Sequence, residues 1–303
     1  MKFRLGTFNT ENLFLRYKFN KNVDPQKFED GNGRITDMGA KIAFDDIAEQ
    51  QRKNTAQVIL AHDPDAICLQ EIENMETLRQ FNRDYLRGKF RYAMLVDGND
   101  PRQIDVGILS KYEIAGVRTH MFDKDKTGVI FSRDCLEATL LKNNGDVLLT
   151  LFANHLKSKA MGTAKATGAK RQRQAERVAA IIKERYGSEA KKARFVVAGD
   201  FNDAPDSPYL SPLLGRPWAE NVVERLPEED RWTYSLSKNK KEQIDYLLLS
   251  KELAAENRDA LPVIERRGLR DKVKAYTGPR FAGIGPDGTE ASDHCAVFIE
   301  LDL

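Results

Sequence analysis

The residues of this chain that could do chemistry gather in six short polar clusters, each beside an apolar run. Their side chains are mostly carboxylates and carboxamides, and two of the four histidines of the chain are among them. The candidate residues are Asn9, Glu11, Glu71, Asn154, His155, Asp200, Asn202, Asp245, Asp293 and His294. Oxygen ligands of this kind suit a hard divalent cation such as Mg²⁺ or Mn²⁺, whereas a zinc site would use more His or Cys. Because such an ion keeps positions for water and substrate phosphate, the pattern predicts metal-assisted hydrolysis of a phosphoester.

The most informative cluster follows the apolar run at 195–198. This run is typical of a buried strand that stops abruptly and presents Asp200 and Asn202 at its end. Strand ends place polar side chains at the rim of a sheet, where catalytic groups tend to lie. A single Asp after a strand is more often a helix cap or a turn residue. The other clusters make a catalytic role the stronger interpretation.

The elements that must position these clusters are short strands with helices between them. The runs are brief, rich in β-branched or aromatic residues and bounded by polar residues, which is typical of strands. They lie at 3–8, 66–69, 106–109, 147–152, 195–198, 246–249 and 296–301. The sequence also predicts helices over 45–60, over 75–86 after an Asn74 cap, and over 175–186. Since strands and helices do not alternate strictly, as they would in a parallel barrel, we expect two packed sheets with helices outside.

Length and composition predict a single domain over residues 1–303. Hydrophobic residues make up 41% of the chain and charged residues 31%, enough for a sizeable core beneath a well-solvated surface. No repeat or linker divides the chain, although polar loops are expected at 17–39 and 278–288. The three cysteines are too few for a disulfide framework and match no zinc motif.

The apolar runs and the N-terminal residues predict where in the cell the protein is found. No run is long enough to span a membrane, and residues 1–5 enter a strand pattern without a signal peptide. As written, the sequence predicts a cytoplasmic protein, and secretion would require that a leader had been removed. No feature predicts an obligate protein partner.

Charge distribution, rather than the net charge of +2, must carry any prediction about nucleic acid. The segment from His155 to Arg177 holds seven cations against the single acid Glu176, a local charge of +6 with His neutral. A run of like charges is usually a solvated face. This run begins at a candidate catalytic His, and we therefore predict that it contacts substrate phosphate. The residues assigned to phosphate are Lys157, Lys170, Arg171 and Arg173.

In their order along the chain, the clusters resemble the motifs of the endonuclease/exonuclease/phosphatase (deoxyribonuclease-I-like) superfamily. The matching stretches are Thr7-Phe8-Asn9, Leu69-Gln70-Glu71, Asn154-His155-Leu156, Gly199-Asp200-Phe201-Asn202, Ile244-Asp245-Tyr246 and Ser292-Asp293-His294. Residues 10–14 and 71–74 resemble its bacterial nuclease-like branch. The resemblance covers nearly the whole chain. It implies an α/β fold, a four-layered sandwich of two mixed β-sheets packed face to face with helices on the outside.

Roles at the metal and at the attacking water follow from the same resemblance. Glu71 would be the main metal ligand, and the residues that support the metal site would be Asn9, Asp293 and Glu11. Asp200 would orient or activate the attacking water, with Asn202 beside it contacting phosphate.

The resemblance also implies roles for the two histidines. Asp245 would hydrogen-bond His294, fixing its tautomer and favouring its charged form, so that His294 binds the scissile phosphate. His155 would stabilise charge that develops on the phosphate or the leaving oxygen. Asn154 would contact substrate phosphate, and Asp105 would orient His155.

Together these features predict a Mg²⁺- or Mn²⁺-dependent phosphodiesterase, a nuclease that acts on DNA rather than RNA through in-line attack of an activated water. Two alternatives stay open. A lipid- or inositol-phosphate-directed phosphoesterase, of the sphingomyelinase or inositol-phosphatase type, would share the catalytic set and add an apolar loop near it. A non-catalytic binding module would show a broken set of motifs.

Overall fold

The computed structural model of the protein describes residues 1–14, 17–19, 44–46, 49–160, 162–237 and 240–303. Within them, two six-stranded mixed sheets carry the fold. The first sheet has the strand order β17–β18–β1–β4–β6–β5, and the second has the order β13–β16–β12–β11–β10–β7.

The bounds of the elements are as follows. The first sheet consists of β1 (Lys2–Leu13), β4 (Ala66–Ile72), β5 (Tyr92–Leu95), β6 (Asp105–Ser110), β17 (Val263–Glu265) and β18 (Ala296–Asp302). The second consists of β7 (Ile114–Arg118), β10 (Cys135–Leu141), β11 (Val147–His155), β12 (Phe195–Asp200), β13 (Ala219–Asn221) and β16 (Asp245–Ser250). Small two-stranded sheets pair β2 (Tyr17–Phe19) with β3 (Phe44–Asp46), β8 (Lys124–Asp125) with β9 (Gly128–Val129), and β14 (Tyr234–Ser237) with β15 (Lys240–Glu242). The α-helices are α2 (Glu49–His62), α3 (Met75–Asp84), α4 (Ala164–Tyr186), α5 (Ser211–Leu214) and α6 (Lys251–Glu256).

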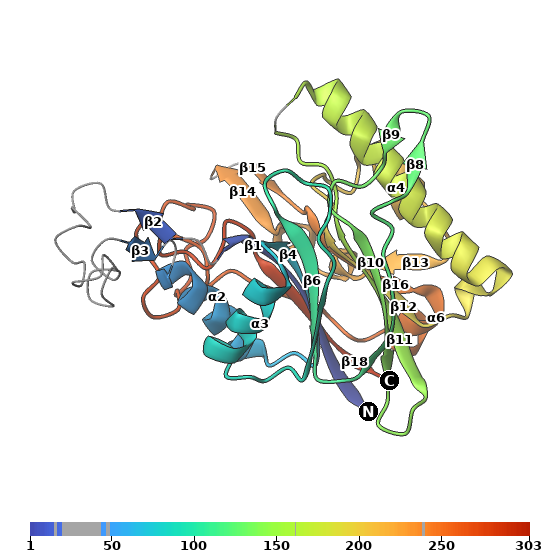
Figure 1. Ribbon diagram of the computed structural model, residues 1–303, viewed down its shortest axis with the longest axis horizontal. Coiled ribbons are helices and arrows are strands. Elements are labelled where there is room, and N and C mark those ends of the chain that lie inside the picture. Colours follow the sequence, from blue (N-terminus) through green and yellow to red (C-terminus); the bar gives the residue numbers. More distant parts are fainter. Residues whose placement is uncertain (15–16, 20–43, 47–48, 161, 238–239) are drawn as a thin grey trace, which may run out of the picture.

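The two large sheets pack face to face, and helices cover their outer faces (Figure 1). Alternate residues of both sheets, such as Leu5 and Leu151, point inward and form a shared buried cluster. Helix α3 packs Leu78 and Phe81 against the outer face of the first sheet, beside α2. Helix α4 covers the outer face of the second sheet with Val178 and its apolar neighbours. The layers follow the order helix, sheet, sheet, helix, which confirms the predicted four-layered sandwich.

The topology decides where the polar strand ends meet. Strands β1 and β4 run parallel in the first sheet, and β11 and β12 run parallel in the second. Strands β18 and β16 run antiparallel to these neighbours. Asn9 near the end of β1 reaches Asp200 at the end of β12. One edge of the sandwich therefore collects the carboxyl ends of the parallel strands and the amino ends of β16 and β18.

The strands are longer than the apolar runs that predicted them. The run at 3–8 becomes Lys2–Leu13, and the run at 147–152 becomes Val147–His155. Backbone hydrogen bonds continue the sheet beyond the apolar residues. The polar side chains at the strand ends face a cleft instead of the core, so they add no apolar residues to the pattern.

All three predicted helices have different bounds, and the largest difference is in α4, which begins at Ala164 instead of residue 175. Helix α2 begins at Glu49 instead of residue 45, since residues 45 and 46 pair in β3. Helix α3 begins at Met75, where the side chain of Asn74 accepts the backbone N–H of Thr77 and so confirms the predicted cap. The predicted loop at 17–39 lies, from residue 20 onward, outside the described residues.

Hydrogen bonds to the buried carboxylate of Glu265 link the end of α2 to β17 and give a pH-dependent stability. The Glu265 carboxylate lies 2.7 Å from Nε2 of His62 and also accepts hydrogen bonds from Arg267. Burial opposes its ionisation, but these contacts outweigh the burial and lower the pKa of Glu265 from 4.5 to about 2. A depressed folded-state pKa stabilises the fold above the unfolded-state pKa, and that stability is lost as the pH falls from 4.5 towards about 2.

We therefore expect Glu265→Gln to lower the free energy of unfolding at pH 7 by roughly 2 kcal/mol. At a pH near the folded-state pKa of about 2, the wild-type carboxyl takes up a proton as well, so the difference between the two proteins should shrink. Urea titrations at both pH values measure this. An equal loss at both values would show that the charge of Glu265 does not stabilise the fold.

Among the described residues, no helix combines the length and the apolarity that crossing a bilayer requires.

Candidate active site

The polar strand ends of both large sheets open into one cavity of about 300 Å³. Asn9 and Glu71 enter it from the first sheet, and His155 and Asp200 enter it from the second. Loops and the β14–β15 hairpin complete the wall. The lining residues are Asn9, Glu71, Arg102, His155, Ser158, Lys159, Ala160, Asp200, Asn202, Tyr234, Glu242, Ile244, Asp293 and His294.

Asp200 is a buried carboxylate that amide groups hold on both of its oxygens. Its Oδ2 accepts hydrogen bonds from Nδ2 of Asn9 (3.1 Å) and Nδ2 of Asn202 (2.8 Å). Its Oδ1 accepts the backbone N–H of Asn202 at 2.7 Å. Burial would raise the pKa of Asp200, but the charge of His294 and the contact with His155 outweigh it and hold the pKa below its ordinary value. Asp200 is therefore ionised at neutral pH and can orient a water or accept its proton.

The residue before Asp200 must be glycine for this placement. Gly199 has a φ of +137°, and a Cβ there would lie 1.9 Å from the carbonyl oxygen of Asn154 on β11. No L side chain fits that conformation or that space. The Gly-Asp pair of the sequence motif thus reflects the close approach of β11 and β12 at the cavity.

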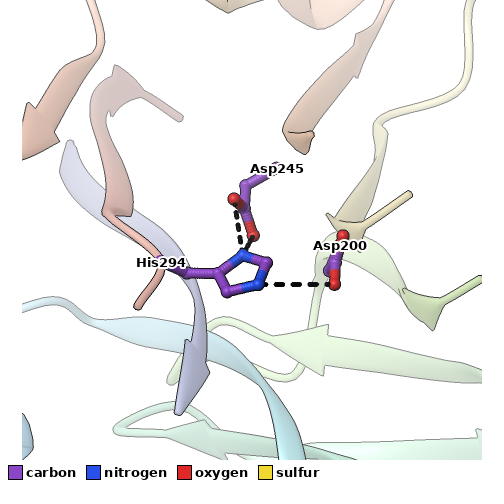
Figure 2. Close-up of side chains that lie close together, drawn as sticks. All are labelled: Asp200, Asp245 and His294. Carbon is purple, nitrogen blue, oxygen red and sulfur yellow. Dashed lines mark hydrogen bonds and ion pairs between the residues drawn. The ribbon is translucent and has the colours of Figure 1, made fainter. Parts of the chain in front are cut away.

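His294 lies between two carboxylates, with its ring between Asp245 and Asp200 (Figure 2). Its Nδ1 is 3.0 Å from Oδ2 of Asp245, and its Nε2 is 3.9 Å from Oδ2 of Asp200. Burial opposes protonation of the ring, but the charges of Asp245, Asp293 and Asp200 outweigh burial and raise the pKa of His294 well above its ordinary value. Burial raises the pKa of Asp245 to about 6. This value is still below neutral pH, so both members of the pair are charged there. The Nε2–H of an imidazolium is a donor suited to a phosphate oxygen.

Two groups of residues have donors suited to a metal ion. Ligand atoms of Asp200, Asp245 and His294 lie within 4.8 Å of one another. In this first group, however, Nδ1 of His294 and the carboxylate of Asp245 are already hydrogen-bonded to each other. The second group, Glu11, Glu71 and Asp293, is the set predicted from the sequence, and its ligand atoms do not all lie within that distance of one another. Glu71 and Asp293 line the cavity, whereas Glu11 does not line it and contacts Asp293 by accepting its backbone N–H.

The electrostatics of the second group fit a hard cation. Burial and the charge of Asp293 raise the pKa of Glu11 to about 7. Burial, with the charge of Glu71 added, raises the pKa of Asp293 against the opposing effect of His294. A bound Mg²⁺ or Mn²⁺ would relieve the repulsion between these carboxylates, and carboxylate oxygens are the ligands that such ions prefer.

Glu71 reaches the cavity because the strand is irregular at that point. Its φ is +64°, and the pairing of β4 with β6 shifts between Gln70 and Ile72. Regular alternation would turn the residue after Gln70 towards the outer helices, and the bulge turns Glu71 towards the cavity instead. Glu11 and Asn202 also have a positive φ, of 49° and 56°. A non-glycine residue in this conformation costs about 1–3 kcal/mol, and such residues cluster at functional sites.

His155 has an arginine partner that the sequence did not suggest. Arg133, which is 2% exposed, places its Nη2 2.9 Å from Nε2 of His155 and its Nη1 3.1 Å from Oδ2 of Asp100. Burial and the charge of Arg133 lower the pKa of His155. This leaves the ring uncharged at neutral pH, and its Nε2 also lies 3.3 Å from Oδ2 of Asp200. The positive charge beside His155 therefore resides on Arg133.

Asn154 and Asp105, which were both predicted to act at the site, do not reach the cavity. Asn154 precedes His155 on β11, and its Nδ2 donates to the carbonyl of Phe152 on the outer face of the sheet. Because successive side chains of a strand alternate, placing His155 in the cavity turns Asn154 away from it, which contradicts the predicted phosphate contact. Asp105 accepts the backbone N–H of Gly98 at 2.9 Å. The structure thus gives Asp105 another partner, and Arg133 takes the place predicted for it beside His155.

The basic segment is largely neutralised by carboxylates from elsewhere in the chain. Arg171 is buried, and its guanidinium donates to Asp203 and to the carbonyl of Lys157. Arg173 forms two hydrogen bonds with Asp125. The ammonium groups of Lys157 and Lys170 donate to Ala160 and Ser132, respectively.

The lining of the cavity includes none of the four cations that were assigned to phosphate. Arg171 is buried and its guanidinium is already bound to Asp203, which does not favour the predicted phosphate contact. Lys157, Lys170 and Arg173 have the intramolecular partners given above, and their contact with phosphate stays a prediction.

Several cavity residues carry no sequence signal of their own. Tyr234 packs its ring 5.0 Å from the ring of His294, and the two residues form an isolated β-bridge. Arg102 lines the cavity from the loop before β6, and Lys159 lines it from the loop after β11. Single Tyr and Arg residues are common along any chain. Tyr234 is recognised as a site residue only because it lies close in space to the Ser-Asp-His motif.

Comparisons with known proteins identify the family and the fold. A model of the Endonuclease/Exonuclease/phosphatase family matches residues 42–294. No curated protein sequence matches the chain.

Three solved structures share the fold at low identity. A truncated Caenorhabditis elegans TDP2 is 15% identical, with a TM-score of 0.61, and the match covers 100% of this chain and 98% of that one. A D. rerio TDP2 complexed with a single-strand DNA product is 17% identical, with a TM-score of 0.59 and coverage of 100% and 99%. A Bacteroides thetaiotaomicron mannosyl-6-phosphatase is 14% identical, with a TM-score of 0.57 and coverage of 99% and 100%.

Proposed function

Because the chain belongs to the Endonuclease/Exonuclease/phosphatase family, we propose that it is a divalent-metal-dependent phosphodiesterase that hydrolyses DNA. The family fold supports phosphoester hydrolysis as the reaction class. The observation that carries the proposal is the meeting of Asp200, the Asp245–His294 pair and Glu71 at one cavity. These side chains supply a base, a charged hydrogen-bond donor and a cation ligand within a single site.

The chain's own residues divide the work of an in-line attack. Asp200 is ionised and accepts hydrogen bonds from Asn9 and Asn202, which hold it in position to orient the attacking water. Protonated His294 donates to a phosphate oxygen, and Asp245 holds its ring and its charge. The charge of Arg133, next to His155, favours the negative charge that develops on the phosphate.

Glu71, Asn9, Asp293 and Glu11 would hold Mg²⁺ or Mn²⁺. When bound, the ion would polarise the phosphate and stabilise negative charge on its oxygens. Oε2 of Glu11 accepts the backbone N–H of Asp293, which keeps the two carboxylates together.

DNA is the substrate that the surroundings of the site favour. The phenol ring of Tyr234 forms part of the cavity wall, where it can pack on a sugar or a base. Arg102 and Lys159 place cations at the same cavity. One of the structurally similar proteins, the D. rerio TDP2, is complexed with a single-strand DNA product.

The two alternatives have less support. A lipid-directed enzyme would place exposed apolar residues beside the site, but none of the large exposed apolar residues of the described chain lines the cavity. A non-catalytic module would lack part of the constellation, whereas Asp200, Asp245 and His294 are all in place. A sugar phosphate is a second candidate substrate, because a mannosyl-6-phosphatase shares the fold over 99% of this chain.

Supercoiled plasmid incubated with the protein and Mg²⁺ or Mn²⁺ tests the proposal. We expect nicking with either ion, none in EDTA, and recovery when the ion is restored, because the carboxylate cluster needs a cation to bind phosphate. Glu71→Gln should require a metal concentration roughly 10–100-fold higher. Intact DNA and RNA, together with release of phosphate from a sugar phosphate or inositol phosphate, would exclude the nuclease assignment.

A further inference from the structure

A second cavity, of about 680 Å³, adjoins the catalytic one. We call it the Tyr209 groove, and we define it by Lys159, Ala164, Thr167, Asp203, Ser207 and Tyr209, which line it. Lys159 lines both cavities. Asp203 follows Asn202, a catalytic-cavity residue, directly in the chain. The two spaces are therefore neighbours that share a wall.

The floor of the groove is held rigidly to the catalytic residues. The carboxylate of Asp203 accepts hydrogen bonds from Arg171 and, at 2.8 Å, from the hydroxyl of Ser207. The ring of Tyr209 lies against Gly168 of α4, where a Cβ would come within 2.4 Å of it. The guanidinium of Arg171 lies 5.8 Å from the centre of that ring. This segment is fixed before any ligand binds, as binding cavities usually are.

Lys159 stands at the boundary between the two cavities. Its Nζ is 2.6 Å from Oε2 of Glu242 and 3.2 Å from Oδ1 of Asp203, and its side chain is 47% exposed. An exposed ion pair of this kind is weak, so a phosphate can replace one of the carboxylates at little cost. Lys159 is thus a cation placed where a phosphodiester leaves the catalytic cavity.

The chemistry of the groove suits an uncharged polar group. Lys159 and Arg171 are matched by Asp203 and Asp206, so the lining residues carry balanced charge. Thr167 and Ser207 contribute hydroxyl groups, and Tyr209 contributes an aromatic face. Hydroxyl and carboxylate groups bind a sugar, and an aromatic face packs on a base.

We propose that the Tyr209 groove binds the sugar and base of the nucleotide next to the scissile phosphate, while Lys159 donates to a phosphate oxygen between the two cavities. This inference rests on the proposed nuclease function. It predicts that the protein distinguishes an oligonucleotide from a small phosphodiester through the groove.

The test blocks the groove and leaves the catalytic cavity intact. Ala164 is exposed at the start of α4 and lines the groove; Ala166 is exposed in the same turn and does not line it. Ala164→Trp fills the groove, and Ala166→Trp is the matched control, with the same change of residue on the same helix. Two quantities are measured for both variants and for the wild type. One is the affinity of metal-free protein for fluorescein-labelled hexathymidylate, by anisotropy. The other is the ratio of kcat/KM for that oligonucleotide to kcat/KM for methyl p-nitrophenyl phosphate.

We expect Ala164→Trp to weaken hexathymidylate binding and to lower the kcat/KM ratio by about 10-fold each, because a stacked base contributes that much to binding. Ala166→Trp should match the wild type in both. Equal behaviour of the two variants would overturn the inference. It would also be overturned if Ala164→Trp impaired cleavage of mannose 6-phosphate and left the oligonucleotide unaffected, since the occupant would then be a free sugar. Failure of the wild type to cleave any phosphoester would refute the proposed function instead, and the anisotropy measurement would still decide the groove.

Discussion

Asp200→Asn is expected to lower kcat for phosphodiester hydrolysis by roughly 10²–10⁴-fold, the range for loss of a general base or water-positioning group. The physical reason is that a carboxamide cannot accept the proton of the attacking water. The change in shape is small. The amide oxygen can still accept the backbone N–H of Asn202, which Oδ1 of Asp200 accepts at 2.7 Å.

The fold should survive this substitution because only part of the hydrogen-bond network is lost. Oδ2 of Asp200 accepts from both Asn9 and Asn202, and an amide nitrogen in its place would face those donors. We expect a loss of stability of about 1–3 kcal/mol, measured by urea unfolding. A kcat loss far larger than this stability change would separate catalysis from folding.

Asp134→Asn is the matched control for Asp200→Asn. Asp134 is 1% exposed and accepts the backbone N–H of His120, yet it does not line the cavity. The Asp134→Asn variant should unfold at a urea concentration similar to that of Asp200→Asn, and its kcat should stay near the wild-type value. If Asp200→Asn retained more than a tenth of wild-type kcat, Asp200 would not be the group that activates water.

His294→Gln should be the second most damaging substitution, with a loss of roughly 10²–10³-fold in kcat. Glutamine keeps a hydrogen-bond donor but has no positive charge to place on the phosphate. The wild-type ring is charged because Asp245, Asp293 and Asp200 outweigh the effect of burial on its pKa. Most of the expected loss is therefore the loss of that charge.

The part that Asp245 plays can be separated by a double-mutant cycle. Asp245 contacts the ring of His294 at 3.0 Å and does not line the cavity, so it acts on substrate only through His294. Asp245→Asn alone should lower kcat less than His294→Gln does. The double variant should lose little more than His294→Gln alone, because the two residues work as one unit. Additive losses would contradict this coupling.

His62→Gln is the control for His294→Gln. His62 also contacts a carboxylate, Glu265, at 2.7 Å, and it lies outside the cavity. Its substitution should change stability and leave kcat for the plasmid substrate near the wild-type value. A comparable loss of kcat in both variants would mean that histidine–carboxylate pairs matter here through folding alone.

The fold was largely predictable because its signals are local. Each apolar run at 66–69, 106–109 or 195–198 lies inside an observed strand, and the Asn74 cap starts α3 as expected. The ends of the elements were less predictable. Backbone pairing extends β1 to Leu13 through residues that carry no apolar signal.

The catalytic part of the candidate site was predictable for the same reason. Asp200, Asp245 and His294 each stand next to a recognisable strand, and their order along the chain marks the family. Glu71 was found as a residue, but its direction was not, because a φ of +64° at a bulge has no sequence signature.

What the sequence determined by itself is the set of strands and the polar residue at the end of each, since a run of side chains and its boundary are adjacent in the chain. What the tertiary structure decided is which charges meet. The +6 segment is matched by carboxylates such as Asp125, which lies 48 positions from Arg173, and His155 meets Arg133, 22 positions away. Alternation on β11 decides that His155 enters the cavity while Asn154 does not. Pairing between distant residues depends on which face of a strand turns inward and where a loop returns, and no local pattern records either.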